Sequence, residues 1–167
     1  IRGERDALPA VAESIERFFE TEASDWERLA AERGFELTFD DETVVGMIDA
    51  LCRRPDGDLV VLDYKATRKT RSLDDDLQLP IYLLACEQLF EEPVRTAGYA
   101  YVGEQGPRVD LREFTEEELA RVQAQLSDRL SSAAESSFDE YTPGDHCKYC
   151  PHRSLPCSEE AAVDIER

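Results

Sequence analysis

Two aspartates and a lysine lie in apolar segments, where charged side chains are costly. Asp49 stands inside the segment Val44–Cys52, and Asp63 and Lys65 stand two residues apart near the end of Leu59–Lys65. Residues two apart in a strand share a face, so one carboxylate and the ammonium are expected side by side. Two aspartates on neighbouring apolar strands would repel one another and be expensive to desolvate. A Mg²⁺ or Mn²⁺ ion held by these oxygens would relieve the repulsion.

Such a centre suits the hydrolysis of phosphodiester bonds. A carboxylate-held divalent ion strengthens a water nucleophile and polarises the phosphoryl oxygen. Lys65 is then expected to orient the water or stabilise transition-state charge, and the backbone carbonyl of Tyr64 to add an oxygen ligand. The alternative is structural, with Asp63 and Lys65 as an ion pair at the strand end and Asp49 capping a turn. For an isolated D-x-K that alternative is favoured, because so short a motif is common.

The elements that must position these residues follow from periodicity. Apolar residues at roughly helical spacing predict that the first third is helical, ending at Gly34: Val11, Ile15, Phe18, Phe19, Trp26, Leu29 and Ala30. An antiparallel meander of three strands is expected over residues 35–39, 44–52 and 59–65, because turn-forming residues separate these segments.

The second half of the chain predicts two more helices and two more strands. A helix is expected over residues 77–90, capped by Ser72 and residues 74–76, with Pro80 in its first turn. Strands are expected over residues 96–102 and 108–114, then an amphipathic helix over 116–130 and a polar linker over 131–139. The fold class is therefore predicted as α+β around one sheet.

Three motifs together resemble the RecB-type branch of the PD-(D/E)XK nucleases. Residues 46–49 read G-M-I-D, residues 63–65 read D-Y-K, and residues 78–82 read Q-L-P-I-Y. The branch shows G-x-x-D, D-Y-K and Q-x-x-x-Y. The resemblance implies a restriction-endonuclease-like core, a central mixed sheet with an antiparallel three-strand meander flanked by helices. It covers the chain from about Phe35 to Cys157.

The same resemblance implies roles for individual residues. Asp49 and Asp63 would bind the metal, Lys65 would be catalytic, and Gln78 and Tyr82 would line the active site and the DNA path. An i, i+4 pair shares a helix face, which is consistent with that last role. The branch usually adds a histidine from an early helix; neither His146 nor His152 lies there, so that ligand is expected either upstream of Ile1 or not at all. The carboxylates that could substitute for it are Glu13, Glu16, Glu20 and, on the first strand, Glu36.

Five cysteines are present, and three of them form a C-x₂-C-x₆-C pattern: Cys147, Cys150 and Cys157. By the resemblance these are three ligands of a [4Fe–4S] cluster whose fourth cysteine lies upstream of Ile1. The alternatives are zinc, with His146 or His152 as fourth ligand, and a loop without metal. Cys52 and Cys86 have apolar neighbours and are expected to be buried thiols. Residues 1–140 are predicted as the nuclease core, and residues 141–167 as a cysteine loop and tail packed on it.

The chain is strongly acidic, with 38 Asp and Glu against 19 Lys and Arg and a formal net charge of −19. Acid spread along the whole chain, with arginine replacing most lysine, resembles proteins of salt-loving organisms, in which salt screens self-repulsion. An acidic partner-binding domain is the alternative. Nucleic acid would then require a local cationic region, for which Arg68, Lys69 and Arg71 are candidates. We expect a cytoplasmic protein, because no apolar run spans a bilayer and no signal peptide is present.

The function expected from these observations is that of a metal-dependent DNA nuclease. We expect an exonuclease of DNA repair, recombination or CRISPR-type processing, working on DNA with a possible helicase subunit or domain. The alternative is a catalytically weakened nuclease-like module that binds DNA or a helicase partner. A third interpretation is an interaction domain stapled by its cysteine loop, in which the acidic pair is structural.

Overall fold

The computed structural model describes residues 12–39, 41–66, 70–74, 77–103 and 107–136. The chain divides into two compact units, Ile1–Leu130 and Ser131–Arg167. Of the second unit only the first residues, which continue the last helix, are described, so the predicted boundary between residues 140 and 141 lies outside the described residues. Among the residues that are described, no helix is long and apolar enough to cross a membrane.

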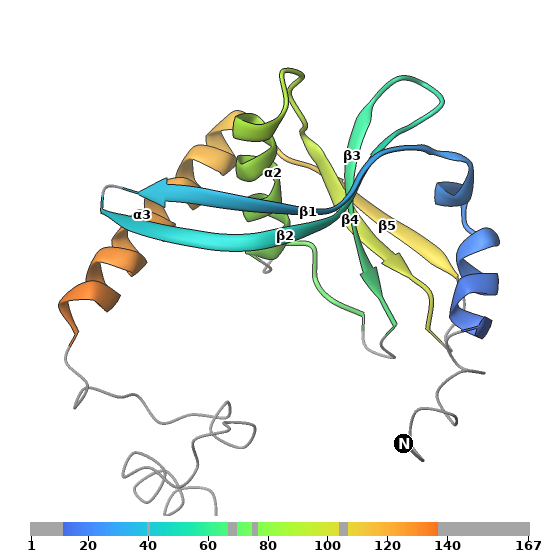
Figure 1. Ribbon diagram of the computed structural model, residues 1–167, viewed down its shortest axis with the longest axis horizontal. Helices are drawn as coiled ribbons and strands as arrows, with labels where there is room; N and C mark the ends of the chain where they lie inside the picture. The colour runs from blue at the N-terminus through green and yellow to red at the C-terminus, as the bar shows by residue number, and fades with distance from the viewer. Residues whose placement is uncertain (1–11, 40, 67–69, 75–76, 104–106, 137–167) are drawn as a thin grey trace, which may run out of the picture. The chain divides into compact units, whose positions relative to one another are not determined.

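Five strands form one mixed sheet in the order β1-β2-β3-β4-β5 (Figure 1). β1, β2 and β3 pair antiparallel, β3 and β4 pair parallel, and β4 and β5 pair antiparallel. The parallel step follows from helix α2, which carries the chain back across the sheet between β3 and β4. The strands are β1 (Glu27–Phe39), β2 (Glu42–Arg53), β3 (Leu59–Lys65), β4 (Thr96–Tyr101) and β5 (Arg108–Glu113). The predicted α+β class, with its mixed sheet and three-strand meander, is confirmed.

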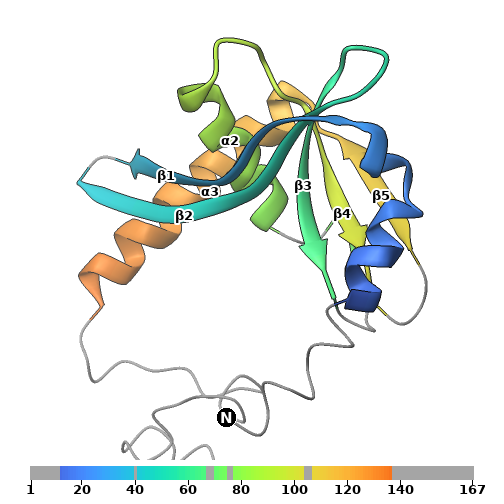
Figure 2. The same cartoon turned by 45° about the vertical axis from the view of Figure 1, so that its right-hand side comes forward.

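Helices cover both faces of the sheet (Figure 2). On one face, α2 (Gln78–Leu89) and the first part of α3 (Glu116–Glu135) pack against strand residues such as Val61. On the other face, a helix over residues 12–19 and the short helix η1 (Glu22–Asp25) pack against the alternate strand residues such as Leu62. Because side chains alternate along β3, each face receives its own apolar core.

The predicted helix up to Gly34 is wrong for its second half. Helical structure ends with η1, and the chain from Glu27 onwards is strand β1. Leu29 and Ala30 favour helices, but helix propensity is a weak preference of a few tenths of a kcal/mol per residue. Pairing with β2, from Glu27 opposite Arg53 to the far end of the hairpin, outweighs that preference.

The later helices differ from expectation at their ends. α3 continues to Glu135, so the segment predicted as the start of a linker is helical. α2 begins at Gln78, with Pro80 in its first turn as predicted, but its N-cap residue Leu77 makes no side-chain capping bond. The Ser72 hydroxyl instead accepts a hydrogen bond from the Asp74 backbone N–H at 3.2 Å. The expected capping by Ser72 is therefore wrong.

One glycine in the sheet provides a test of this packing. A methyl group on Gly98 of β4 would meet the carbonyl oxygen of Asp110 on β5, which is backbone and cannot yield without opening the ladder. We expect Gly98→Ala to destabilise the fold by roughly 1–3 kcal/mol, the usual cost of overpacking. Gly34→Ala is the matched control, because its methyl group would come no closer than 4.0 Å to the Gly46 oxygen. Urea unfolding checks both, and equal stabilities would contradict the packing described.

Candidate active site

Strand β2 parts from β3 at Asp49. The ladder between the two strands ends with Ala50 opposite Leu62. Just beyond that pair, the Asp49 carboxylate accepts a hydrogen bond from the Tyr64 backbone N–H at 3.0 Å. The side chain therefore takes a place that a backbone carbonyl would hold if the ladder continued. This bond fixes Asp49 beside the end of β3.

The alternation of β2 also shifts at this point. Ile48 and Leu51 both enter the core beneath α2, whereas Ala50 belongs to the core on the opposite face. On β1, Glu32 lies at the level of Asp49 and has a φ of 47°, in the left-handed region. A non-glycine residue there costs on the order of 1–3 kcal/mol, which the two long strands around it must offset.

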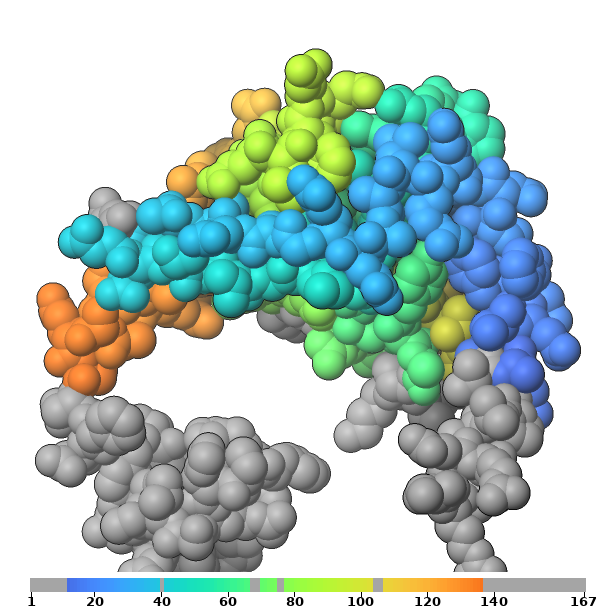
Figure 3. Space-filling view, in the orientation of Figure 1, coloured from blue at the N-terminus to red at the C-terminus, as the bar shows by residue number. Residues whose placement is uncertain are grey.

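Beyond this shift, the β1–β2 hairpin extends past the rest of the sheet with α2 behind it (Figure 1). Its inner face carries Phe35 and Leu37 into the core. Its outer face is at the surface in the space-filling view, and Val45 and Met47 are exposed (Figure 3). One face of this part of the hairpin thus packs beneath α2, and the other face is exposed.

Asp63 is a buried carboxylate in the middle of the sheet. It is 2% exposed, and its register partner on β4 is the fully buried Tyr99. Its Oδ2 is paired with the Lys65 ammonium. Burial raises the pKa of Asp63, and the charge of Asp49 acts in the same direction. The positive charges of Lys65 and Arg71 oppose the rise in pKa without cancelling it.

Lys65 joins the two strands to helix α2. Its Nζ donates a hydrogen bond to the Gln78 Oε1 at 3.1 Å and lies 5.2 Å from the centre of the Tyr99 ring. Together with the Asp63 ion pair, these contacts hold the ammonium on the α2 face of the sheet. The Lys65 side chain keeps 14% of its surface exposed.

A chain of contacts supports Gln78 from behind. The Gln78 Nε2 donates to the Tyr82 hydroxyl at 2.8 Å, one helical turn away. The Tyr82 ring packs edge-on against Phe35 of β1, with centroids 5.9 Å apart. The Phe35 ring in turn covers Gly46, where any side chain would collide with it. The glycine of the G-x-x-D motif thus makes room for the ring that backs Tyr82.

The structure therefore gathers the residues singled out in the three motifs on one side of the sheet, with one distinction. The side chain of Tyr64 points to the opposite face, where it packs against Phe18 at a centroid distance of 5.6 Å. Its backbone, between Asp63 and Lys65, is what lies at the site. The role of the Tyr64 carbonyl as a metal ligand stays a prediction.

The substitutes proposed for the missing histidine do not join this site. Glu36 is exposed and alternates with Phe35 and Leu37, so it faces away from α2 and from Asp63. Glu13, Glu16 and Glu20 are exposed on or just after the N-terminal helix. Throughout the described part of the chain, no three acidic, histidine or cysteine side chains come together as a metal-binding group.

The cysteine loop stays a prediction. Cys147, Cys150 and Cys157 lie outside the described residues, as do His146, His152, Arg68 and Lys69. The two other cysteines are buried thiols as predicted, with Cys52 at 3% exposure and Cys86 fully buried. Burial raises the pKa of Cys86 to about 12, so that this thiol is protonated at neutral pH.

Aromatic residues at the site were missed by the sequence analysis. Tyr99 and Tyr101 alternate on β4 and stand opposite Asp63 and Lys65 in the parallel register. The Tyr101 hydroxyl accepts the Arg71 backbone N–H at 2.9 Å, which anchors the segment after β3. Their alternation predicts a strand, but a parallel register between distant segments leaves no local signal. Arg71 itself was named as a candidate for phosphate contact.

The residues present fit a hard divalent cation. Asp63 offers a buried carboxylate whose pKa stays raised despite its pairing with Lys65, and Asp49 offers a second carboxylate whose charge acts on Asp63. Both are oxygen donors of the kind that Mg²⁺ and Mn²⁺ take. Mg²⁺ commonly needs only one or two carboxylates and retains waters for its remaining positions. Two aspartates therefore suffice as protein ligands.

The raised pKa of Asp63 predicts how stability depends on pH when divalent ions are removed with EDTA. The fold favours the protonated form of the Asp63 carboxyl. Asp63 therefore stabilises the folded chain fully below the usual aspartate pKa, and this stabilisation is lost as pH rises through the pKa of Asp63 in the folded state. Asp63→Asn mimics the neutral form. We expect it to unfold at a higher temperature than the native chain at pH 8 in EDTA, with ~1.4 kcal/mol gained per unit of pKa shift.

Melting curves from pH 4 to 8 measure this dependence. The gain of Asp63→Asn should shrink towards acidic pH, and Asp56→Asn, in the exposed turn before β3, controls for loss of one negative charge. A native chain more stable than Asp63→Asn at pH 8 in EDTA would show that Lys65 outweighs burial.

Known proteins resemble the chain in sequence and in fold. Residues 1–155 match the family model of the PD-(D/E)XK nuclease superfamily. A relative is an ATP-dependent helicase/deoxyribonuclease subunit of Streptococcus uberis (strain ATCC BAA-854 / 0140J), 33% identical over 95 residues. That match covers 52% of this chain and only 9% of the relative.

Two solved structures align with the chain at low identity. The crystal structure of SSO0001 aligns with a TM-score of 0.54 and 17% identity, covering 92% of this chain and 71% of that one. A putative exonuclease from Eubacterium rectale aligns with a TM-score of 0.48 and 14% identity, covering 87% of this chain and 59% of that one. The family model spans nearly the whole sequence, and the chain belongs to the PD-(D/E)XK nuclease superfamily.

Proposed function

We propose that this chain is a DNA nuclease that hydrolyses phosphodiester bonds with a divalent metal ion, Mg²⁺ or Mn²⁺. The observation that carries the proposal is the buried Asp63 carboxylate, which lies beside both Lys65 and a second carboxylate, Asp49. A purely structural ion pair needs only one carboxylate, and a second one close by adds repulsion that costs stability. In a nuclease superfamily, a metal ion is the natural partner for two such carboxylates.

Asp49 and Asp63 would hold the ion, with the Tyr64 carbonyl as a further oxygen donor. The ion would supply Lewis-acid polarisation of the phosphodiester and strengthen a water nucleophile. Lys65 contributes a positive charge beside the reacting phosphate, where charge increases in the transition state. Its partial exposure leaves one side of the ammonium for the substrate.

Gln78 and Tyr82 act on Lys65 as positioning residues. Because the Gln78 Nε2 donates to the Tyr82 hydroxyl, its carbonyl oxygen is directed towards the Lys65 ammonium. An ammonium held by both Asp63 and Gln78 loses little freedom when a phosphate arrives, and such preorganisation is the main source of electrostatic catalysis.

The finer assignment draws on the curated relative, a helicase/deoxyribonuclease subunit. We propose an exonuclease acting in DNA repair or recombination together with a helicase subunit or domain. CRISPR-type processing is the alternative process in which such an exonuclease would act. The alternative function is a nuclease-like module that binds DNA or a helicase partner without efficient turnover. One observation favours it: the described residues supply no third side-chain ligand beside Asp49 and Asp63.

Cleavage of end-labelled linear DNA tests the nuclease directly. The native chain should cut single- or double-stranded DNA only when Mg²⁺ or Mn²⁺ is present, in KCl high enough to screen its net charge of −19. Asp63→Asn and Lys65→Ala should each lower the rate by about 10²-fold or more, the usual effect of removing a group that stabilises transition-state charge.

Asp56→Asn, in an exposed turn, is the matched control and should cut at the native rate. A native chain that binds DNA without cutting it would favour the non-catalytic module. Cleavage that survives both Asp63→Asn and Lys65→Ala would come from a contaminant and would remove support for this site.

Tyr82→Phe tests the positioning chain. The variant keeps the ring that packs against Phe35 but removes the hydroxyl that orients Gln78. We expect kcat to fall by roughly tenfold, the worth of one hydrogen bond at ~1.4 kcal/mol, with little change in KM. Tyr64→Phe is the control, because its ring lies on the opposite face. A rise in KM at unchanged kcat would instead assign Tyr82 to substrate binding.

A further inference from the structure

A second hollow lies apart from the carboxylates, between the first turn of α2, the end of β5 and the outer side of α3. It has a volume of about 450 Å³. Its apolar lining comes from Leu77, Pro80, Phe114 and Val122. Three arginines, Arg112, Arg121 and Arg129, also line it. In a chain with a net charge of −19, three guanidinium groups around one hollow are a local exception.

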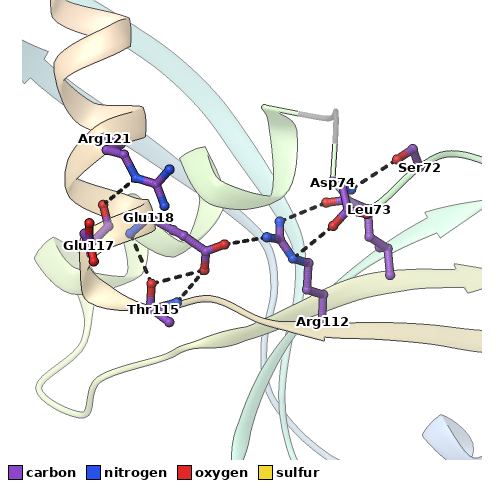
Figure 4. Close-up of polar contacts among 8 residues, drawn as sticks. All are labelled: Ser72, Leu73, Asp74, Arg112, Thr115, Glu117, Glu118 and Arg121. Carbon is purple, nitrogen blue, oxygen red and sulfur yellow. Dashed lines mark hydrogen bonds and ion pairs between the residues drawn. The ribbon is translucent and has the colours of Figure 1, made fainter.

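Arg112 is the fixed centre of this hollow (Figure 4). It forms ion pairs with Asp74 at 3.3 Å and with Glu118 at 2.6 Å, and it donates to the Leu73 carbonyl oxygen at 3.3 Å. Its guanidinium also lies 4.4 Å from the centre of the Phe114 ring. These contacts tie the segment before α2 to β5 and α3.

The acidic residues of the hollow are already engaged. Thr115 and Glu118 form a reciprocal cap at the start of α3: Thr115 N–H donates to Glu118 at 2.8 Å, and Glu118 N–H donates to the Thr115 hydroxyl at 3.2 Å. This hydrogen bonding, together with the charge of Arg112, lowers the pKa of Glu118. Asp74 and Glu118 more than offset the charge of Arg112, so the three arginines of the lining exceed its two carboxylates by one positive charge.

Arg121 and Arg129 present that charge at the surface. With Gln125 between them, they recur every four residues along α3 and lie on one helix face, all three exposed. The Arg121 Nε donates to the Glu117 carbonyl oxygen at 3.4 Å, and its terminal nitrogens do not take part in that bond (Figure 4). Two helical turns separate the two arginines by ~12 Å, about three to four nucleotides of one DNA strand at ~3.4 Å each.

We propose that this arginine hollow binds the phosphate backbone of the nucleic-acid strand on one side of the bond that is cut. The proposal rests on the proposed nuclease function, since it places the same strand in both sites. Leu77 and Pro80 of the hollow lie within two residues of Gln78 at the start of α2, and Gln78 contacts Lys65. The arginines and the Gln125 amide supply donors suited to phosphate oxygens without reading base sequence.

The positive charge of this hollow favours the binding of a nucleic-acid strand there. Carboxylates spread over an acidic chain repel phosphates, so binding depends on the few regions where cations exceed anions. Arg108 and Arg112 lie on the face of β5 that bears the site, with Asp110 between them in an ion pair with Arg108. Arg108 stands in register with Tyr101, which is itself in register with Lys65. The excess positive charge of this region therefore lies on α3.

The test measures binding apart from cleavage. In the Asp63→Asn background, which keeps DNA intact, the affinity for a fluorescent single-stranded oligothymidylate is followed by anisotropy over a series of KCl concentrations. Arg121→Gln with Arg129→Gln should weaken binding and lower the slope of log K against log[KCl] by about 1.4, or ~0.7 for each phosphate that the protein no longer neutralises. The variant with lysine at both positions should retain the slope.

Arg28→Gln with Arg33→Gln is the charge-matched control, because both arginines are exposed on β1, away from the hollow. A slope that falls equally in this control, or does not fall in the α3 variant, overturns the proposal while the cleavage assay of the native chain stands on its own. Binding of poly-L-glutamate that alone depends on Arg121 and Arg129 also overturns it and assigns the hollow to an acidic protein segment. Melting temperatures of all variants confirm that they are folded.

Discussion

The buried carboxylate of Asp63 is the constraint around which the site is organised. An aspartate on an inner strand of the sheet loses its hydration, and its raised pKa records the cost. Lys65, two residues further on the same face, recovers part of that energy. The charge of Asp49 adds to the cost, and the divalent cation that we propose would relieve it.

Several features serve to keep this costly arrangement in place. The Asp49 carboxylate takes the Tyr64 N–H where the β2–β3 ladder ends, so that the two aspartates are brought together by a break in regular pairing. Gly46 leaves room for Phe35, whose ring supports Tyr82, and Tyr82 orients Gln78. A continuous series of contacts therefore connects the glycine of the G-x-x-D motif with the glutamine and tyrosine of the Q-x-x-x-Y motif.

Residues close in sequence were the ones that could be predicted. The strand meander, the face shared by Asp63 and Lys65, and the pairing of Gln78 with Tyr82 follow from periods of two and of about four residues. The strand at residues 27–34 was missed because β1 forms by pairing with β2, whereas Leu29 and Ala30 alone favour a helix. Tyr99 was missed for the same reason, since a parallel register depends on segments more than thirty residues apart, joined through α2.

The residues of the site and the strand that buries Asp63 are separated in the order of synthesis. The residues from Asp49 to Tyr82 come from one uninterrupted stretch, β2, β3 and α2, which emerges before β4 during synthesis. The dehydration of Asp63 needs β4, because Tyr99 covers it only after the parallel pairing forms. The proposed ligands are thus synthesised before the strand that buries one of them. A nascent chain that ends before Thr96 would already carry the residues of the proposed centre, yet Asp63 would still be hydrated.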